Sequence, residues 1–259
     1  MNRKFGRAKH VTTENAVVVV TRPAPDHSRL IRSLGEIGRA AIHNPGFRFE
    51  SEPAERLQRR LKELADFDLA IVTSPMAARL IAAHSTPAMI GNVRFIAPGR
   101  GTASILEAAG LPAAWPEVGG TSEHILAMPV LESMVPGRIA IVGAPGGRTL
   151  LAREFSRRGS EVVAIHLYRR IAVPPNPALL EALGSGADLV VLISSRQAFE
   201  TILEGLPHEL RESWLASSFV VSSARMANLC RDAGARRISI AAGAADQPML
   251  SAALQDGEY

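Results

Sequence analysis

Cysteine and aromatic residues are scarce in this 259-residue chain, and their scarcity excludes several classes of protein. The single cysteine, Cys230, allows no intrachain disulfide and no zinc site built from several cysteines. The seven histidines form no HxH or HxxxH pair, so we expect no metal ion. Aromatic residues make up 5% of the chain, which argues against base stacking and therefore against a nucleic-acid partner.

Long apolar runs are also missing from the sequence. The run from Ala16 to Val20 is far shorter than the roughly 18 residues that a membrane span needs. The basic N-terminal segment contains no apolar stretch of the kind found in signal peptides. We therefore expect a cytoplasmic protein with no membrane partner, whose 47% of apolar residues suffices for a globular core.

Arginine dominates the positive charge of the chain. Lysine and arginine total 29 against 25 acidic residues, and only Lys4, Lys9 and Lys62 are lysines. The forked guanidinium group suits carboxylate or phosphate ligands, because it donates two parallel hydrogen bonds to them. An anionic ligand and ordinary solvent-exposed arginine explain this bias about equally well.

Segments of the first half of the chain recur in the second half in the same order. In each segment an apolar strand is followed by a short turn and by a helix with one apolar face. The paired segments begin at Val17 and Arg138, at Asp68 and Asp188, and at Val93 and Ser217. Apolar strands that alternate with amphipathic helices are typical of parallel sheets covered on both faces. The pattern predicts two similar α/β domains.

The repeated turns follow a strand and precede a helix, which places them at the carboxyl edge of each predicted sheet. Ligands bind at this edge because helix N-termini present backbone N–H groups that lack intrahelical partners. Two such edges that face each other would form one cleft. Two extended segments, 41–53 and 162–175, are interpreted as the connectors between the domains. Further helices are expected over 54–65, 122–134, 177–183 and 247–254, the last with Asp246 as its cap.

The turns at the carboxyl edges supply candidate anion-binding residues. Hydroxyl groups at helix starts cap the helix and can also donate to a carboxylate. The candidates in these turns are Ser74, Gly99, Arg100, Thr102, Arg148, Ser194, Ser195 and Ser223. The turn that contains Arg148 reads GAPGGRT, which has neither the glycine spacing nor the lysine of a P-loop. For each turn a purely structural role stays open beside ligand binding.

Two further candidates lie outside those turns. Arg22 ends the first strand, where it is either an ordinary surface residue or faces the predicted cleft. Tyr168 lies in the second connector, where its ring either packs against the protein or presents the phenol to a ligand. His43 and His166 are interpreted as strand residues in solvent rather than catalysts. The sequence shows no GxSxG motif and nothing that suggests a Ser-His-Asp triad.

Taken together, these residues resemble the uroporphyrinogen-III synthase family over residues 17–254. The resemblance rests on the order and spacing of motifs that are weak one by one. They are Thr21-Arg22-Pro23, Gly38, Val72-Thr73-Ser74, Gly99 with Thr102-Ala103, Ser122-Glu123, Gly143 to Arg148, Tyr168-Arg169-Arg170 and Ile193-Ser194-Ser195. The chain departs from the family pattern at Pro75 and Met76, where asparagine is usual, and at Ser223 and Met226, which replace Gly-x-x-Thr.

The resemblance implies two parallel-sheet, three-layer domains joined by a two-stranded hinge, with the N-terminal βα unit swapped into the C-terminal domain. One domain would comprise residues 15–41 and 172–259, and the other residues 48–165. It also implies a cofactor-free hydro-lyase that cyclises hydroxymethylbilane to uroporphyrinogen III, with inversion of ring D and loss of water. The implied partners are this polycarboxylate substrate and hydroxymethylbilane synthase, which would hand it over to a monomeric enzyme.

Within this resemblance Tyr168 is the expected catalytic proton donor to the leaving hydroxyl. The residues expected to bind substrate carboxylates are Arg22, Ser74, Gly99, Arg100, Thr102, Arg148, Ser194, Ser195 and Ser223. A first rival interpretation is a catalytically altered tetrapyrrole- or anion-binding protein, which the departures at Met76, Ser223 and Met226 favour. A second rival is a phosphosugar enzyme, which would need a carboxylate or histidine base close to the serine and threonine turns.

Overall fold

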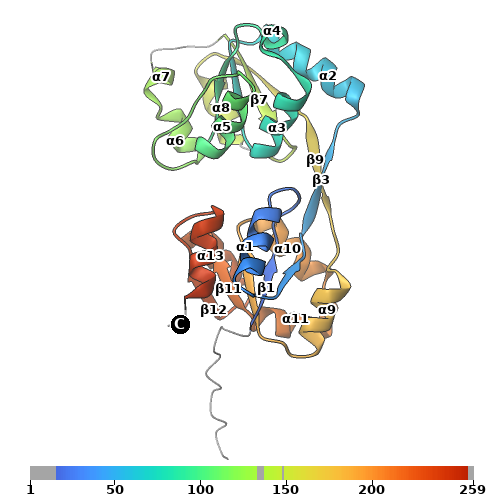
Figure 1. Ribbon diagram of the computed structural model, residues 1–259. Coiled ribbons are helices and arrows are strands. Elements are labelled where there is room, and N and C mark those ends of the chain that lie inside the picture. The colour runs from blue at the N-terminus through green and yellow to red at the C-terminus, as the bar shows by residue number, and fades with distance from the viewer. Residues whose placement is uncertain (1–15, 133–136, 148, 256–259) are drawn as a thin grey trace, which may run out of the picture. The chain divides into compact units, whose positions relative to one another are not determined.

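The chain divides into two compact units, each built around its own sheet (Figure 1). The computed structural model describes residues 16–132, 137–147 and 149–255. The first unit comprises residues 1–48 and 171–259, and the second comprises residues 49–170. The second unit is therefore inserted into the sequence of the first.

A sheet of five parallel strands forms the centre of the first unit. Its strands are β1 (Val17–Val20), β2 (Ala41–His43), β10 (Leu189–Ile193), β11 (Ser218–Val221) and β12 (Arg237–Ile240). They are hydrogen-bonded in the order β12-β11-β10-β1-β2. The central strand β10 reads LVVLI and is buried at every position, as expected for a strand covered on both faces.

Helices cover both faces of this sheet. They are α1 (Ser28–Glu36), α9 (Pro177–Gly184), α10 (Arg196–Gly205), α11 (His208–Leu215), α12 (Ala224–Asp232) and α13 (Asp246–Leu254). Phe199 of α10, Trp214 of α11 and Phe219 of β11 belong to the core on one face. Leu30 of α1 and Met249 of α13 belong to the core on the other. The first unit is thus a three-layer α/β structure.

The second unit repeats this plan. Its strands are β4 (Leu69–Val72), β5 (Arg94–Ile96), β6 (Ala113–Ala114), β7 (Arg138–Gly143) and β8 (Glu161–His166). They are parallel neighbours in the order β6-β5-β4-β7-β8. Its helices are α2 (Ala54–Glu63), η2 (Leu64–Asp66), α3 (Pro75–His84), α4 (Pro87–Ile90), α5 (Arg100–Ala108), α6 (Ser122–Leu126), α7 (Pro129–Glu132) and α8 (Thr149–Arg157). Two apolar clusters, one around Leu61 and Ile81 and one around Ile71 and Phe155, form its core.

Corresponding strands take corresponding places in the two sheets. In the sequence repeat β10 corresponds to β4, and β1 corresponds to β7. β10 and β4 are each the middle strand of a five-stranded sheet, and β1 and β7 each lie beside that middle strand. In the first unit β1 and β2 come from the start of the chain and join strands from its end. The predicted α/β class with parallel sheets is confirmed, as is the duplication read from the sequence.

The predicted connectors are shorter than expected. β3 (Phe47–Ser51) and β9 (Tyr168–Ala172) form a two-stranded sheet where the chain passes from one unit to the other. The first parts of the segments 41–53 and 162–175 are instead edge strands, because β2 pairs with β1 and β8 pairs with β7. The prediction that both segments connect the domains along their whole length was therefore wrong.

Three of the four smaller helices lie where the sequence placed them, as α2 with η2, α9 and α13. The helix expected over 122–134 is instead two short helices, α6 and α7, and its last two residues lie outside the described part of the chain. Proline disfavours helical geometry in the residue before it, here Met128, so α6 does not continue through this point: it ends at Leu126 and α7 begins at Pro129. Asp246 does not cap α13, since Ala245 is the cap and Asp246 is the first helical residue.

Within the described residues, no helix is both long and apolar enough to cross a membrane. The same part of the chain brings together no group of histidine, cysteine, aspartate and glutamate side chains that could hold a metal ion.

Candidate active site

Several predicted site residues are the caps of helices that start at a carboxyl edge. Ser74 Oγ accepts from the Ala77 N–H at 3.2 Å and caps α3. Ser195 caps α10 and Ser223 caps α12 in the same way, at 3.4 Å from the backbone nitrogen three residues on. Each hydroxyl thus has a structural role, and each also lies beside backbone N–H groups at the positive end of a helix.

The structure brings together two of the predicted site residues, Ser74 and Tyr168. The Ser74 hydroxyl lies 2.9 Å from the phenol oxygen of Tyr168. The Tyr168 ring is 1% exposed, belongs to the core of the second unit and meets the Phe49 ring edge-on at 5.2 Å. Ser74 is only half-buried. The packed-ring alternative for Tyr168 is therefore realised, and its hydroxyl points to the start of α3.

A second contact joins the residue that follows β4 to the end of β7, where the glycine-rich turn begins. Thr73 donates from Oγ1 to the Val142 carbonyl at 3.0 Å. A Cβ built on Gly143 would lie 2.3 Å from that Thr73 oxygen, so a side chain at this position conflicts with the Thr73 hydroxyl. The turn continues through Gly146, whose φ of +74° favours glycine. The predicted anion-binding residue Arg148 lies outside the described residues.

Three further predicted residues lie at the start of α5, and they differ in exposure. Gly99 is the cap residue of α5 and its carbonyl accepts from the Thr102 N–H at 3.1 Å. Arg100 is exposed at the first position of the helix. Thr102 is 3% exposed and belongs to the buried face of the helix. Of the three, Arg100 is the one whose side chain is accessible to a ligand.

In the first unit Arg22 is already engaged by the protein. Its guanidinium forms an ion pair with Asp246 and donates to the Ala244 carbonyl, and its side chain is 16% exposed. Asp246 was not predicted as a partner of Arg22, because 224 positions separate the two residues in the sequence. Ser194 is half-buried after β10. A substrate carboxylate at Arg22 would have to compete with Asp246.

Two histidines near the carboxyl edge of the first sheet are stacked. The rings of His27 and His43 lie 3.8 Å apart and nearly parallel, at 9°. His43 Nε2 is 2.7 Å from the Arg22 carbonyl oxygen. Burial and the neighbouring His43 lower the pKa of His27, and Asp26 opposes them. His43 is therefore a packed strand residue, whereas His166 is exposed as expected.

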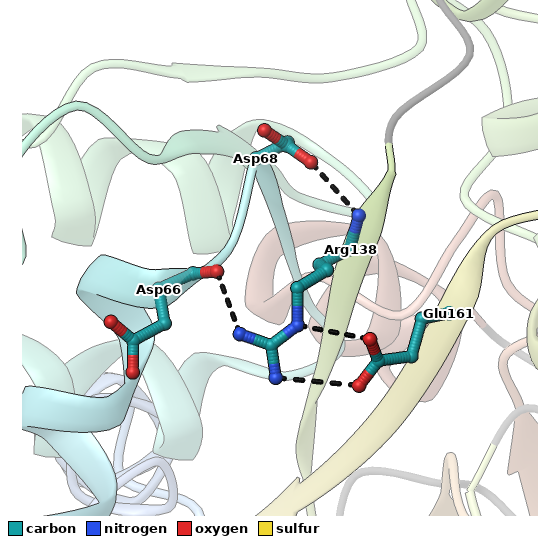
Figure 2. A network of polar contacts seen from close by, with 4 residues as sticks. All are labelled: Asp66, Asp68, Arg138 and Glu161. Carbon is teal, nitrogen blue, oxygen red and sulfur yellow. Dashed lines mark hydrogen bonds and ion pairs between the residues drawn. The ribbon is translucent and has the colours of Figure 1, made fainter.

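The opposite, amino edge of the second sheet is closed by an ion network (Figure 2). Arg138 donates from Nε and Nη2 to the Glu161 carboxylate at 3.1 and 3.3 Å, and from Nη1 to the Asp66 carbonyl at 3.0 Å. Its backbone N–H donates to Asp68 at 2.8 Å. A hollow of about 440 Å³ beside this network is lined by Asp66, Asp68 and Arg94, among others. Its aspartates would repel a polycarboxylate, so we place the candidate site at the carboxyl edge.

Comparison with known protein families shows the family to which the chain belongs. The model of the family described as Uroporphyrinogen-III synthase HemD matches residues 28–251, most of the chain. The chain belongs to the uroporphyrinogen-III synthase family. The matched range includes the Ser74–Tyr168 pair and the caps of α10 and α12 in the first unit.

Curated members of the uroporphyrinogen-III synthase family resemble the chain over most of its length. The enzyme of Escherichia coli strain K12 is 29% identical over 243 residues, which cover 91% of this chain and 98% of that protein. The enzyme of Salmonella typhimurium strain LT2 is also 29% identical, over 91% of this chain and 98% of its own length.

Solved structures show the same fold. A mutant uroporphyrinogen III synthase from the extremely thermophilic bacterium Thermus thermophilus has a TM-score of 0.61 at 22% identity and covers 93% of this chain and 100% of its own. Uroporphyrinogen-III synthetase from Helicobacter pylori 26695 also has a TM-score of 0.61, at 17% identity, over 92% of this chain and 98% of its own. At such identities the structures support the shared fold alone.

Proposed function

We propose that the protein cyclises hydroxymethylbilane to uroporphyrinogen III, with inversion of ring D and release of water. The observation that carries the proposal is the family match over residues 28–251 together with the near full-length similarity to enzymes of that name. The carboxyl edges supply hydroxyl groups and helix N-termini of the kind that bind carboxylates. This makes the protein a cyclising hydro-lyase of tetrapyrrole synthesis.

The substrate is a flexible linear tetrapyrrole with eight carboxylates. Each well-formed hydrogen bond to a carboxylate contributes roughly 1.5–3 kcal/mol before desolvation is counted. The residues that we propose for this binding are the capping serines Ser74, Ser195 and Ser223, with the exposed Arg100. Such contacts restrict the shapes that the flexible chain of pyrroles can take.

The reaction itself asks for little acid–base chemistry. The pyrrole nitrogen of ring A pushes out the hydroxyl of its hydroxymethyl group, which leaves as water once it has received a proton, and a protonated azafulvene (an azafulvenium cation) remains. The substituted carbon of ring D attacks it, and the resulting spiro intermediate fragments and recloses with ring D inverted. We propose Tyr168 as the source of the proton, since it belongs to the hydroxyl pair at the start of α3.

Uncatalysed closure gives the type I isomer, in which ring D is not inverted. The protein must therefore select a geometry as well as lower a modest barrier, and positioning by many contacts does this. The absence of a catalytic triad pattern in the sequence agrees with such a reaction.

The isomer of the product tests the proposed function. Hydroxymethylbilane is generated in situ, the protein is added, and the oxidised porphyrins are separated by chromatography. We expect a clear excess of type III, and the heat-denatured protein as control should give type I. Type I alone with the native protein would refute the enzyme.

The engagement of Arg22 favours one alternative, a tetrapyrrole- or anion-binding protein that has lost catalysis. Asp246 neutralises this arginine, and the start of α12 carries Ser223 and Met226 in place of Gly-x-x-Thr. Such a protein would bind the linear tetrapyrrole, detected by equilibrium dialysis with a stable analogue, yet leave the isomer ratio unchanged.

A further inference from the structure

The burial of Tyr168 raises a question about the route of the proton. The residue is 1% exposed, and its ring is packed among the core side chains of the second unit. Its hydroxyl makes a hydrogen bond with the Ser74 hydroxyl, which is half-buried and stands at the start of α3. A leaving group outside the protein would meet the serine hydroxyl before the phenol.

We propose that Ser74 is the catalytic hydroxyl that touches the leaving group, and that Tyr168 acts through Ser74 as a buried proton reserve. The inference rests on the proposed function and refines the role of two residues of that site. It reverses the order expected from the sequence, in which the phenol itself reaches the substrate.

The hydrogen bonds of Ser74 fit this order. A serine oxygen has two lone pairs and one hydrogen. One lone pair accepts from the Ala77 N–H at 3.2 Å. Either hydroxyl can donate across the 2.9 Å between Ser74 and Tyr168, and the relay uses the arrangement in which the phenol donates to the second lone pair of Ser74. Among the described residues the Ser74 hydrogen then has no acceptor of its own, so it is available to a ligand. Two accepted hydrogen bonds also polarise the hydroxyl and make it a stronger donor.

The first unit offers a comparison, because it has a helix cap that corresponds to Ser74. Ser195 caps α10 there as Ser74 caps α3. The chain that leaves β2 passes this cap at Gly46, where a Cβ would lie 2.5 Å from the Ala198 backbone. The backbone at Gly46 therefore lies directly against the first turn of α10. A capping serine needs no tyrosine to start its helix, so capping does not account for the hydrogen bond between the Tyr168 and Ser74 hydroxyls.

The proton balance of the step is closed. As the carbon–oxygen bond breaks, the Ser74 Oγ proton moves to the leaving oxygen, which departs as water. The Tyr168 proton moves to Ser74 Oγ, and a phenolate remains. The proton that the attacking ring D loses when its pyrrole regains aromaticity returns through Ser74 to the phenolate. The pyrrole nitrogen supplies the electron pair, so the step needs no other reactant.

Variants of Ser74 separate relay from capping. Ser74→Asn keeps a good helix cap but has no hydroxyl to pass a proton, and Ser74→Thr keeps both. At saturating substrate we expect Ser74→Asn and Tyr168→Phe each to form type III product about tenfold more slowly with similar KM, and Ser74→Thr to restore the rate. Thr86→Ala is the matched control, because it removes an exposed cap of the same unit, that of α4, and should leave the rate unchanged.

The double variant decides between the two orders. If the proton passes through both hydroxyls in series, Ser74→Asn with Tyr168→Phe is no slower than either single variant. Multiplied losses, or a full rate in Ser74→Asn, would overturn the proposal, because the phenol would then act without the serine. If the wild-type protein formed only the type I product, the proposed function itself would be refuted.

A spectroscopic readout tests the pair without turnover. Tyr259 is the only other tyrosine in the sequence, so Tyr259→Phe leaves Tyr168 as the sole phenol. In that background Ser74→Ala should move the ¹³Cζ resonance of labelled Tyr168, whereas Thr86→Ala should not. An unmoved resonance would show that the two hydroxyls are not bonded in solution and would overturn the relay.

Discussion

Gly143 gives the sharpest test of the packing at the carboxyl edge of the second sheet. A Cβ at this position would lie 2.3 Å from Thr73 Oγ1 but 3.6 Å from Thr73 Cβ. The φ angle of Gly143 is not positive, so the overlap with the hydroxyl, and not backbone strain, opposes a side chain. Gly143→Ala should therefore destabilise the unit, and Thr73→Ala should remove the conflict.

The expected change in the free energy of unfolding follows from the overlap with Thr73 Oγ1 and from the hydrogen bond that this oxygen donates. Overpacking of this kind costs about 1–3 kcal/mol, and replacing glycine by alanine returns about 0.4–1 kcal/mol through the unfolded chain. We expect Gly143→Ala to lower the free energy of unfolding by about 1–2 kcal/mol. Thr73→Ala alone should lose about 1 kcal/mol with the hydrogen bond to the Val142 carbonyl. The double variant should be no less stable than Thr73→Ala.

Urea unfolding followed by circular dichroism measures these free energies, provided that the slope with denaturant is unchanged. The coupling between the two substitutions is the quantity of interest. Costs that simply add, or a Gly143→Ala variant as stable as the wild type, would show that the Thr73 hydroxyl does not occupy this place.

Three further predictions concern the first unit. Arg22→Gln and Asp246→Asn should together cost about 0.5–1 kcal/mol less than the sum of their separate costs in urea unfolding, and additive costs would mean that the ion pair contributes nothing. The lowered pKa of His27, caused mainly by burial and then by His43, means that the unfolded chain binds the proton first, so stability should fall as pH drops below about 6.5. His27→Gln should flatten that dependence, and an unchanged slope would assign it to other groups. Burial raises the pKa of the Cys230 thiol to about 12, so a thiol reagent near neutral pH should label it only as fast as the protein unfolds, and rapid labelling of the native protein would contradict its burial.

The sequence was a good guide wherever a run of residues carried its own pattern. The strands VVVV and LVVLI are apolar throughout because helices cover both faces of the sheet, and this is visible without a structure. The duplication then predicted corresponding strands for both sheets. The three-residue strand Ala41–His43 is too short to show a period, which is why it was read as part of a connector.

The side-chain pairings could not be read in the same way. Ser74 and Tyr168 lie 94 positions apart, and both were candidates, but only the fold shows that their hydroxyls meet. Asp246 looked like a helix cap because aspartate often is one, yet the fold gives it Arg22 as a partner. Thr102 looked like a ligand at a helix start, but the phase of α5 turns it into the core.

The ratio of type III to type I product, measured while the amount of protein is raised against a fixed supply of hydroxymethylbilane, tests the central claim most directly. Spontaneous and directed closure compete for the same substrate, so the account predicts that type III rises with the protein until it makes up nearly all of the product. A ratio that stays at the spontaneous value at every protein concentration would contradict it.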